Sequence, residues 1–292
     1  MDFKKFFKDE AYCWMYKTLA FGVAAAILFT AGVFSTSVFT TETKTAAVQT
    51  QSAQSSSSSS SSAADSSAPQ QDQSSTSSKP PVTITDENKT EMTTAEIIEL
   101  FNKSANKVKE EAVTVTKNYE YRKYLEENSE VPSKLQGMAS TLMSTAFKDD
   151  TEPVVYATRE EIIENYQTPG QTWSSILTEN EVEEAICADN GNEYEIYLRL
   201  KTSENPENGE GVAKAFDTIT ASEVKDSAPA MLKDFTTEYF NCEIRCKIDK
   251  ETGRMTWSNY TSPVIMKVNV EFFGTVAAKV ALSFEKDYTI AY

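Results

Sequence analysis

The sequence predicts an α+β protein in three parts: a single N-terminal transmembrane helix, a Ser-rich disordered linker, and an exported domain whose amphipathic helices pack on an antiparallel β-meander. Three observations lead to this prediction. Residues 18–39 form a long run without charge, residues 51–80 consist largely of serine, and residues 93–292 change from helical periodicity to strand alternation. We therefore expect a cytoplasmic tail at 1–17, a linker at 40–92 and an extracytoplasmic domain at 93–292.

The first element is the apolar run Thr18–Phe39, whose 22 residues include no charged side chain. As a helix it would be about 33 Å long, which matches the hydrocarbon core of a bilayer. Four lysines precede the run and only Lys44 follows closely, so the positive-inside rule places the N-terminus in the cytoplasm. The prediction is a single-pass protein of the cell membrane that contacts the lipid bilayer through residues 18–39 and has an extracellular C-terminal domain.

A cleaved signal peptide is the alternative for this run, because a basic segment precedes it and the small residues Ser35, Thr36 and Ser37 follow it. The preceding segment is long and contains acids, and no A-x-A cleavage pattern follows. These features favour an uncleaved signal anchor. Both interpretations export the domain.

The second element is the serine tract Gln51–Pro80, which has no aromatic or branched aliphatic residue and includes eight consecutive serines. Such a segment cannot bury enough apolar surface to offset the entropy of ordering it, so we expect disorder. Residues 41–80 would act as a tether with an r.m.s. span of roughly 35 Å.

The exported domain begins with a predicted helix. Thr93 and Glu96 form a capping-box signature, and apolar residues follow it at helical spacing. Two more signatures, Thr158 with Glu161 and Thr178 with Glu181, predict short helices over residues 159–166 and 179–188. Further helical segments are expected after Pro132 and between Val212 and Phe235. The expected core positions of the first helix and of the helix after Pro132 are Ile97, Phe101, Ala105, Val108, Ala112, Leu135, Met138, Leu142 and Ala146.

Strand alternation occupies most of the remaining domain. Residues 113–121 alternate with Val113, Val115, Tyr119 and Tyr121 on one side, and residues 193–200 follow a turn at "ADNGN". Four more strands are expected at 240–248, 255–257, 264–272 and 276–284, with turns at "DKETG" and Gly274. On the polar face of this meander, Glu243, Arg245 and Lys247 are expected to lie opposite Lys267, Glu271 and Lys279.

Composition excludes several kinds of chemistry. The chain has no histidine, so Ser-His-Asp triads, HExxH motifs and histidine-ligated zinc are absent. The net charge of −16 repels phosphate backbones, so we expect no nucleic-acid partner. Three acidic strings, at 126–130, 189–193 and 204–211, lack the spacing of a calcium loop. The sequence therefore predicts no catalytic residue, no cofactor and no metal ligand.

The four cysteines are Cys13, Cys187, Cys242 and Cys246. Cys242 and Cys246 are four residues apart in a predicted strand, about 13 Å along it, which is too far for a disulfide between them. Pairing of Cys187 with one of the two stays open. We expect the cysteines of the domain to be small buried apolar residues.

These observations favour a non-catalytic binding or assembly role for a membrane-anchored extracytoplasmic domain. One alternative is a carrier or sensor of an apolar ligand in a sheet-lined cavity, which a core packed by Ile97, Phe101 and Leu142 would exclude. A second alternative is a wall-active hydrolase that uses two carboxylates about 5 to 9.5 Å apart. The ligand, the partner and the oligomeric state are left open.

Overall fold

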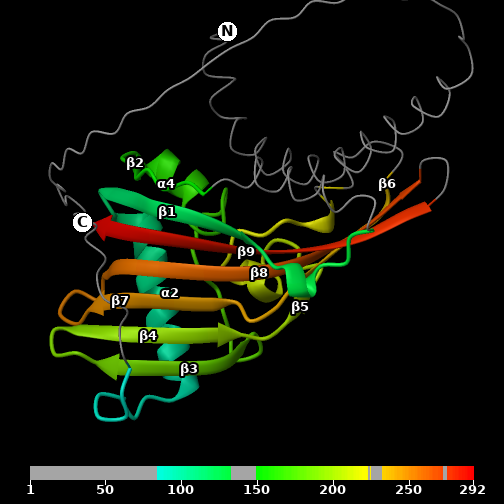
Figure 1. Ribbon diagram of the computed structural model, residues 1–292. Helices are drawn as coiled ribbons and strands as arrows, with labels where there is room; N and C mark the ends of the chain where they lie inside the picture. Colours follow the sequence, from blue (N-terminus) through cyan, green and yellow to red (C-terminus); the bar gives the residue numbers. More distant parts are fainter. Residues whose placement is uncertain (1–83, 133–148, 223, 225–231, 272–274) are drawn as a thin grey trace, which may run out of the picture.

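The computed structural model describes residues 84–132, 149–222, 224, 232–271 and 275–292. This part of the chain is a mostly antiparallel β-sheet with few helices (Figure 1). The predicted anchor, most of the linker and nearly all of the helix expected after Pro132 lie outside the described residues. Among the helices that are described, none combines the length and the apolar character needed to cross a membrane.

Nine strands of the described residues join in one sheet. Its main order is β2-β1-β9-β8-β7-β4-β3, and every pairing is antiparallel. The short β5 pairs with β6, and β6 pairs with β8. The bounds are β1 Thr114–Tyr124, β2 Val154–Tyr156, β3 Val182–Asp189, β4 Glu193–Leu200, β5 Ser203–Glu204, β6 Leu232–Tyr239, β7 Glu243–Asp249, β8 Met255–Glu271 and β9 Thr275–Ala291.

Strand β8 has two different neighbours on one of its sides. Its first part pairs with β7 as far as Thr261, and its second part pairs with β6 from Val264 onward. Pro263 lies at this fork, where a residue without an N–H group can interrupt a ladder at little cost. Strand β9 pairs with β8 from Thr275 to Thr289, so the two strands project together beyond the main sheet, where β6 joins them (Figure 1).

One face of the sheet is covered by helix α2, Thr94–Glu111. The predicted capping box is present, because the side chains of Thr93 and Glu96 each bond to the backbone of the other residue. Ile97, Phe101 and the other predicted core positions of this helix are buried against the sheet, and in Figure 1 the helix lies behind the strands. The second predicted capping box also begins a helix, α4 at Arg159–Asn165. Two short 3₁₀ helices, η1 Glu126–Asn128 and η2 Gly211–Lys214, complete the described helical structure apart from a few helical residues near 221–224.

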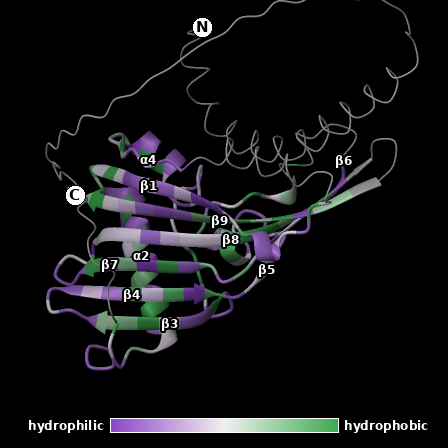
Figure 2. Ribbon diagram, viewed as in Figure 1, coloured by the Kyte–Doolittle hydropathy of each residue, from purple (hydrophilic) through white to green (hydrophobic). Residues whose placement is uncertain are grey.

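The core lies between α2 and the facing side of the strands. Alternate residues of β4 and β7 point into it, and Figure 2 shows hydrophilic and hydrophobic residues alternating along these strands. Three tyrosines, Tyr166, Tyr260 and Tyr288, meet there with their rings edge to face. The three described cysteines are buried there and unpaired, which confirms their apolar role and leaves no disulfide from Cys187. The other buried positions of the two strands are Ile196, Leu198, Leu200, Ile244 and Ile248.

The third capping-box signature, Thr178 with Glu181, does not begin the helix predicted over residues 179–188. The Thr178 amide and hydroxyl do bond to the Glu181 carboxylate, at 2.9 and 2.7 Å. However, residues 182–189 form strand β3 and not a helix, since they pair with β4 along its whole length. The local cap motif closes a turn here, and pairing with β4, the next strand of the chain, overrides the helical signal.

Three further expectations about the meander need correction. Residues 232–235, the end of the segment expected to be helical, belong to strand β6, and residues 255–257 and 264–271 belong to one long strand. The partners expected for β7 are also wrong: its polar face lies opposite Trp257, Asn259 and Thr261. The reason is that β7 ends its pairing with β8 before Lys267 is reached.

Candidate functional site

A bulge in β1 decides which side chains meet on each face of the sheet. The register of β1 against β9 shifts between Lys117 and Tyr119. As a result Val115 is fully buried, while Tyr121 is 41 % exposed on the other face. The sequence prediction of one continuous alternation through these residues is therefore wrong, because an extra residue in one strand exchanges the faces of all later residues of that strand.

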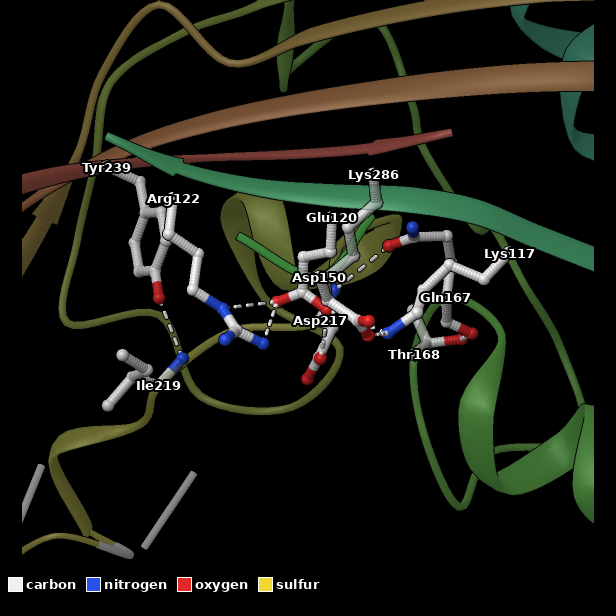
Figure 3. Close-up of polar contacts among 10 residues, drawn as sticks. All are labelled: Lys117, Glu120, Arg122, Asp150, Gln167, Thr168, Asp217, Ile219, Tyr239 and Lys286. Carbon is white, nitrogen blue, oxygen red and sulfur yellow. Dashed lines mark hydrogen bonds and ion pairs between the residues drawn. The ribbon is translucent and has the colours of Figure 1, made fainter. Parts of the chain in front are cut away.

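On the covered face, the bulge brings charged residues into the interior (Figure 3). The Glu120 carboxylate accepts bonds from the Lys117 ammonium at 3.0 Å and from two nitrogens of Arg122 at 3.1 and 3.0 Å. Lys117 also pairs with Asp150 at 3.1 Å. A second pair, Lys286 with Asp217 at 2.8 Å, lies beside the first in Figure 3. We call Lys117, Glu120, Arg122, Asp150, Asp217 and Lys286 the ion-pair cluster.

The electrostatics of the ion-pair cluster centre on Glu120, which is 2 % exposed. Burial alone would raise the pKa of this carboxyl. The positive charges of Lys286, Lys117 and Arg122 outweigh burial and lower the pKa to about 2. The carboxylate is thus held ionised, which does not suit a general acid near neutral pH.

The cluster serves mainly to join segments of the chain. Its charges balance, with three cations facing three carboxylates. The Glu120 and Asp150 backbones bond to each other at 2.7 and 2.9 Å, and the Asp217 amide donates to the Gln167 side chain at 3.3 Å. Because each carboxylate already has a cation of this chain, the cluster ties β1 and β9 to the loops that cross them and presents no free group to a substrate.

A further buried charge lies near the cluster. Lys109 of α2 is 2 % exposed, and its ammonium donates to the backbone oxygens of Thr168 and Gln171 at 2.8 and 2.9 Å. Burial lowers its pKa to about 7, and the more distant charges of Glu164 and Asp217 oppose this shift. Lys109 is not among the core positions that the sequence predicts for this helix.

The other face of the sheet is left open by the described helices, and it faces the viewer in Figure 1. Cross-strand pairing arranges its polar side chains in rows that run from β1 to β3. Both rows combine aromatic and charged groups, and the central row also contains an amide. The central row is Tyr119, Asp287, Asn259, Arg245, Tyr197 and Ile186, and the next row is Tyr121, Glu285, Thr261, Glu243, Arg199 and Glu184.

One end of this open face concentrates rings and carboxylates. The rings of Tyr119 and Tyr121 are stacked, with centroids 4.3 Å apart. The Tyr119 hydroxyl donates to Glu285 at 3.0 Å, and the Trp257 indole donates to Asp287 at 2.9 Å. Asn259 lies between the two carboxylates, and its amide donates to Glu285 at 3.0 Å. We call Tyr119, Tyr121, Trp257, Asn259, Glu285 and Asp287 the aromatic–acid patch.

The carboxylates of the aromatic–acid patch differ from those of the ion-pair cluster. Asp287 is 7 % exposed and bonds to the neutral donors Asn118 and Trp257. Burial raises the pKa of Asp287, and the nearby negative charge of Glu285 raises it further. Within the described part of the chain, no lysine or arginine forms an ion pair with either carboxylate.

The structure accounts for the acidic strings considered as metal sites. Residues 126–128 form η1, and the Asp189 carboxylate accepts bonds from Lys250 and from the Gly191 amide. No group of acidic or cysteine residues suited to a metal ion occurs among the residues that the structure describes. Of the residues named for a filled core, Ile97 and Phe101 are buried, while Leu142 lies outside the described part.

Sequence patterns did not single out Lys109, Glu120 or the aromatic–acid patch as special positions. The patch had a partial signal, because its two tyrosines and Trp257 lie in predicted strands, but their meeting depends on the β1 bulge and on the order of β1, β9 and β8. No family model, curated protein or solved structure matches the chain.

Proposed function

We propose that this chain is a membrane-anchored extracytoplasmic recognition protein with a non-catalytic role. Residues 18–39 anchor it, residues 40–92 tether it, and the sheet of residues 93–292 presents its open face to a partner. The observation that carries this proposal is the asymmetry of the sheet. One face forms the packed core, while the other displays the aromatic–acid patch without a covering helix in the described part of the chain.

The character of this face supports recognition more than plain solubility. A solvated sheet face carries mainly short polar and charged side chains, whereas aromatic rings are enriched where partners bind. Tyr121 is among the few large hydrophobic side chains of the described residues that are more than a third exposed. Its ring stacks on that of Tyr119, and Trp257 lies on β8, on the far side of β9 from β1.

The proposal favours binding over catalysis because of how the interior carboxylates are used. Glu120, Asp150 and Asp217 each face a cation of the chain at 3.1 Å or less. A wall-active hydrolase would need one carboxyl free to protonate a leaving group. The groups on the open face lie side by side on paired strands, an arrangement that suits contact with an extended partner.

Thiol labelling tests both the location and the occupied face. In a Cys13→Ser background, Tyr121→Cys places a thiol on the open face, and Ile176→Cys places one elsewhere; both positions are 41 % exposed. The remaining three cysteines are buried. We expect an impermeant maleimide to label both variants equally in purified protein, and in intact cells to label Ile176→Cys readily and Tyr121→Cys several-fold more slowly, because the partner covers the patch.

Two results would contradict the proposal. Equal labelling of both variants in intact cells would mean that no partner covers the open face. Labelling of wild-type Cys13 in intact cells, with neither introduced thiol accessible until lysis, would reverse the proposed orientation.

A further inference from the structure

The strongest candidate for a specific binding site is the aromatic–acid patch. Contacts between cations and aromatic rings elsewhere in the chain indicate what this patch could bind. The described residues contain three contacts in which a cation lies over an aromatic ring. These are Arg245 over Tyr197 at 5.3 Å, Lys250 over Tyr194 at 4.7 Å, and Arg254 over Tyr292 at 4.8 Å from the ring centroid. Such contacts gain from the negative face of the ring.

Each of these three cations also pairs with a carboxylate. Arg245 lies 3.9 Å from Glu243, Lys250 lies 2.6 Å from Asp189, and Arg254 lies 3.0 Å from Glu111. The recurring arrangement on this domain is therefore a ring and a carboxylate that share one cation. The first of the three occurs on the open face itself, in the same row of cross-strand neighbours as the patch.

The patch contains the ring and carboxylate components of this arrangement. Tyr119 and Tyr121 stack beside Glu285, and Trp257 lies against Asp287. The two carboxylates lie close enough to share the Asn259 amide, at 3.0 and 3.4 Å, and the side chains of the described residues that donate to them are all neutral. A positive charge placed here would gain from both carboxylates and from the ring faces.

We propose that the aromatic–acid patch binds a cationic segment of a protein partner, whose ammonium or guanidinium group takes the place that Arg245 takes beside Tyr197 and Glu243. This inference rests on the proposed function, because it names the partner class for the same open face. Charge complementarity supports it at two scales. The patch carries two carboxylates without a cation from the described residues, and the chain as a whole carries −16. The long-range field attracts the segment, and the patch sets where it docks.

The direct test uses the full chain in a neutral detergent without sugar headgroups, titrated into fluorescent hexalysine. The wild-type chain is expected to bind, and the double variant Glu285→Gln with Asp287→Asn is expected to bind at least about tenfold more weakly. The matched control is Glu243→Gln with Glu184→Gln, which removes the same charge from the same face. Because Glu243 and Glu184 already form ion pairs with Arg245 and Arg199, the affinity of the control for hexalysine is expected to stay within about twofold of the wild-type value.

A second pair of variants keeps the test decisive if the buried Asp287 substitution impairs folding. Tyr121 is exposed, so Tyr121→Leu and Tyr121→Phe are both expected to fold. Loss of the ring in Tyr121→Leu should weaken hexalysine binding about threefold, whereas Tyr121→Phe should bind as the wild type does.

Three outcomes would overturn the inference. Absence of hexalysine binding would do so, and so would equal weakening by the patch and control double variants, which would mean diffuse attraction to an acidic surface. Binding of neutral chitohexaose in place of hexalysine, lost in Tyr121→Leu, would make the patch a glycan platform. That last result would leave the proposed recognition function standing, so the two proposals can fail separately.

Discussion

Glu120 illustrates how one residue of register changes the chemistry of a strand. Without the bulge between Lys117 and Tyr119, the alternation begun by Val115 would place Tyr119 and Tyr121 in the core and Glu120 in water. With it, a carboxylate is 2 % exposed and three cations gather around it. Burying such groups costs several kcal/mol per ion, which good geometry can offset but seldom exceeds.

We therefore expect Glu120→Gln to lower the free energy of unfolding by about 3 to 5 kcal/mol, because it leaves the positive charges of Lys117 and Arg122 buried without their shared counter-charge. Urea unfolding at pH 7, followed by circular dichroism, measures this change. The exposed Glu127→Gln is the matched control and should unfold at the wild-type midpoint. A wild-type midpoint for Glu120→Gln would show that the cluster adds no stability through this residue.

The same residue predicts a pH effect. The pKa of Glu120 is lowered from 4.5 to about 2 in the folded state, so the unfolded chain takes up a proton at higher pH than the folded chain does. Its contribution to stability is complete above pH 4.5 and is lost as the pH falls toward 2. Acid titration of the wild type should show a loss across this window that is smaller in Glu120→Gln.

Lys109 predicts a second pH effect of the same sign, in a window at higher pH. Burial lowers its pKa from 10.5 to about 7, so between these values the unfolded chain holds the proton and the folded chain does not. The free energy of unfolding should therefore rise with pH, by about 1.5 kcal/mol between pH 7 and 8.5. Lys109→Met should remove this rise, whereas the exposed Lys103→Met should retain it. A wild-type stability that is flat over this range would contradict a neutral Lys109.

At the scale of elements, one short sequence signature gives two different structures. A threonine followed three residues later by glutamate begins α2 at Thr93 and α4 at Thr158, but closes a turn before β3 at Thr178. The local bonds form in all three places. The structure of the residues that follow depends on whether they pair with a neighbouring strand, as β3 does with β4.

The cap of α2 can be tested directly. Thr93→Ala removes the side-chain acceptor for the Glu96 amide and should lower the free energy of unfolding by about 1 kcal/mol. Thr94→Ala, one residue further and exposed, should change it by less than about 0.5 kcal/mol. Thermal unfolding of the two variants provides the comparison, and an equal loss in both would contradict a specific capping role.

Elements with strong periodicity were predictable from sequence. The helix beginning at Thr94, the strand at 193–200 and the inward residues of β7 follow directly from spacing. Strand β6 was not predictable in this way, because Lys233, Asp234 and the threonines of this segment weaken its alternation, and its pairing with β8 is what makes it a strand. The aromatic–acid patch depends on the same kind of long-range pairing.

At the scale of the whole molecule, the class of the fold was predictable, and its topology was not. An antiparallel sheet with a covering helix follows from the periodicities. The last strands of the main path, β7, β8 and β9, are neighbours in chain order as the predicted meander requires, but β1 lies beside β9 and β4 lies beside β7, so the order of the whole sheet does not follow the chain. No local pattern in 114–124 identifies β9 as its partner.

The acidic charge of the chain leads to a prediction for the whole domain. A net charge of −16 makes the compact state repel itself, and salt screens this repulsion over a distance of about 10 Å at 0.1 M. Raising sodium chloride from about 20 to about 300 mM should therefore stabilise the protein by roughly 1 kcal/mol, or 2 to 4 °C in Tm. A fall in Tm would show that surface ion pairs outweigh the net repulsion.

The pairing of β1 with β9 also limits the order in which the strands of the sheet can pair during synthesis. Thr114 lies opposite Ala291, so β1 cannot pair along this side until β9 has been synthesised. The hairpin of β8 and β9 can form as soon as it is synthesised, because its contacts are local. Until β9 has emerged from the ribosome, the edge of β1 that pairs with it is open, and other nascent chains can pair with that edge and aggregate.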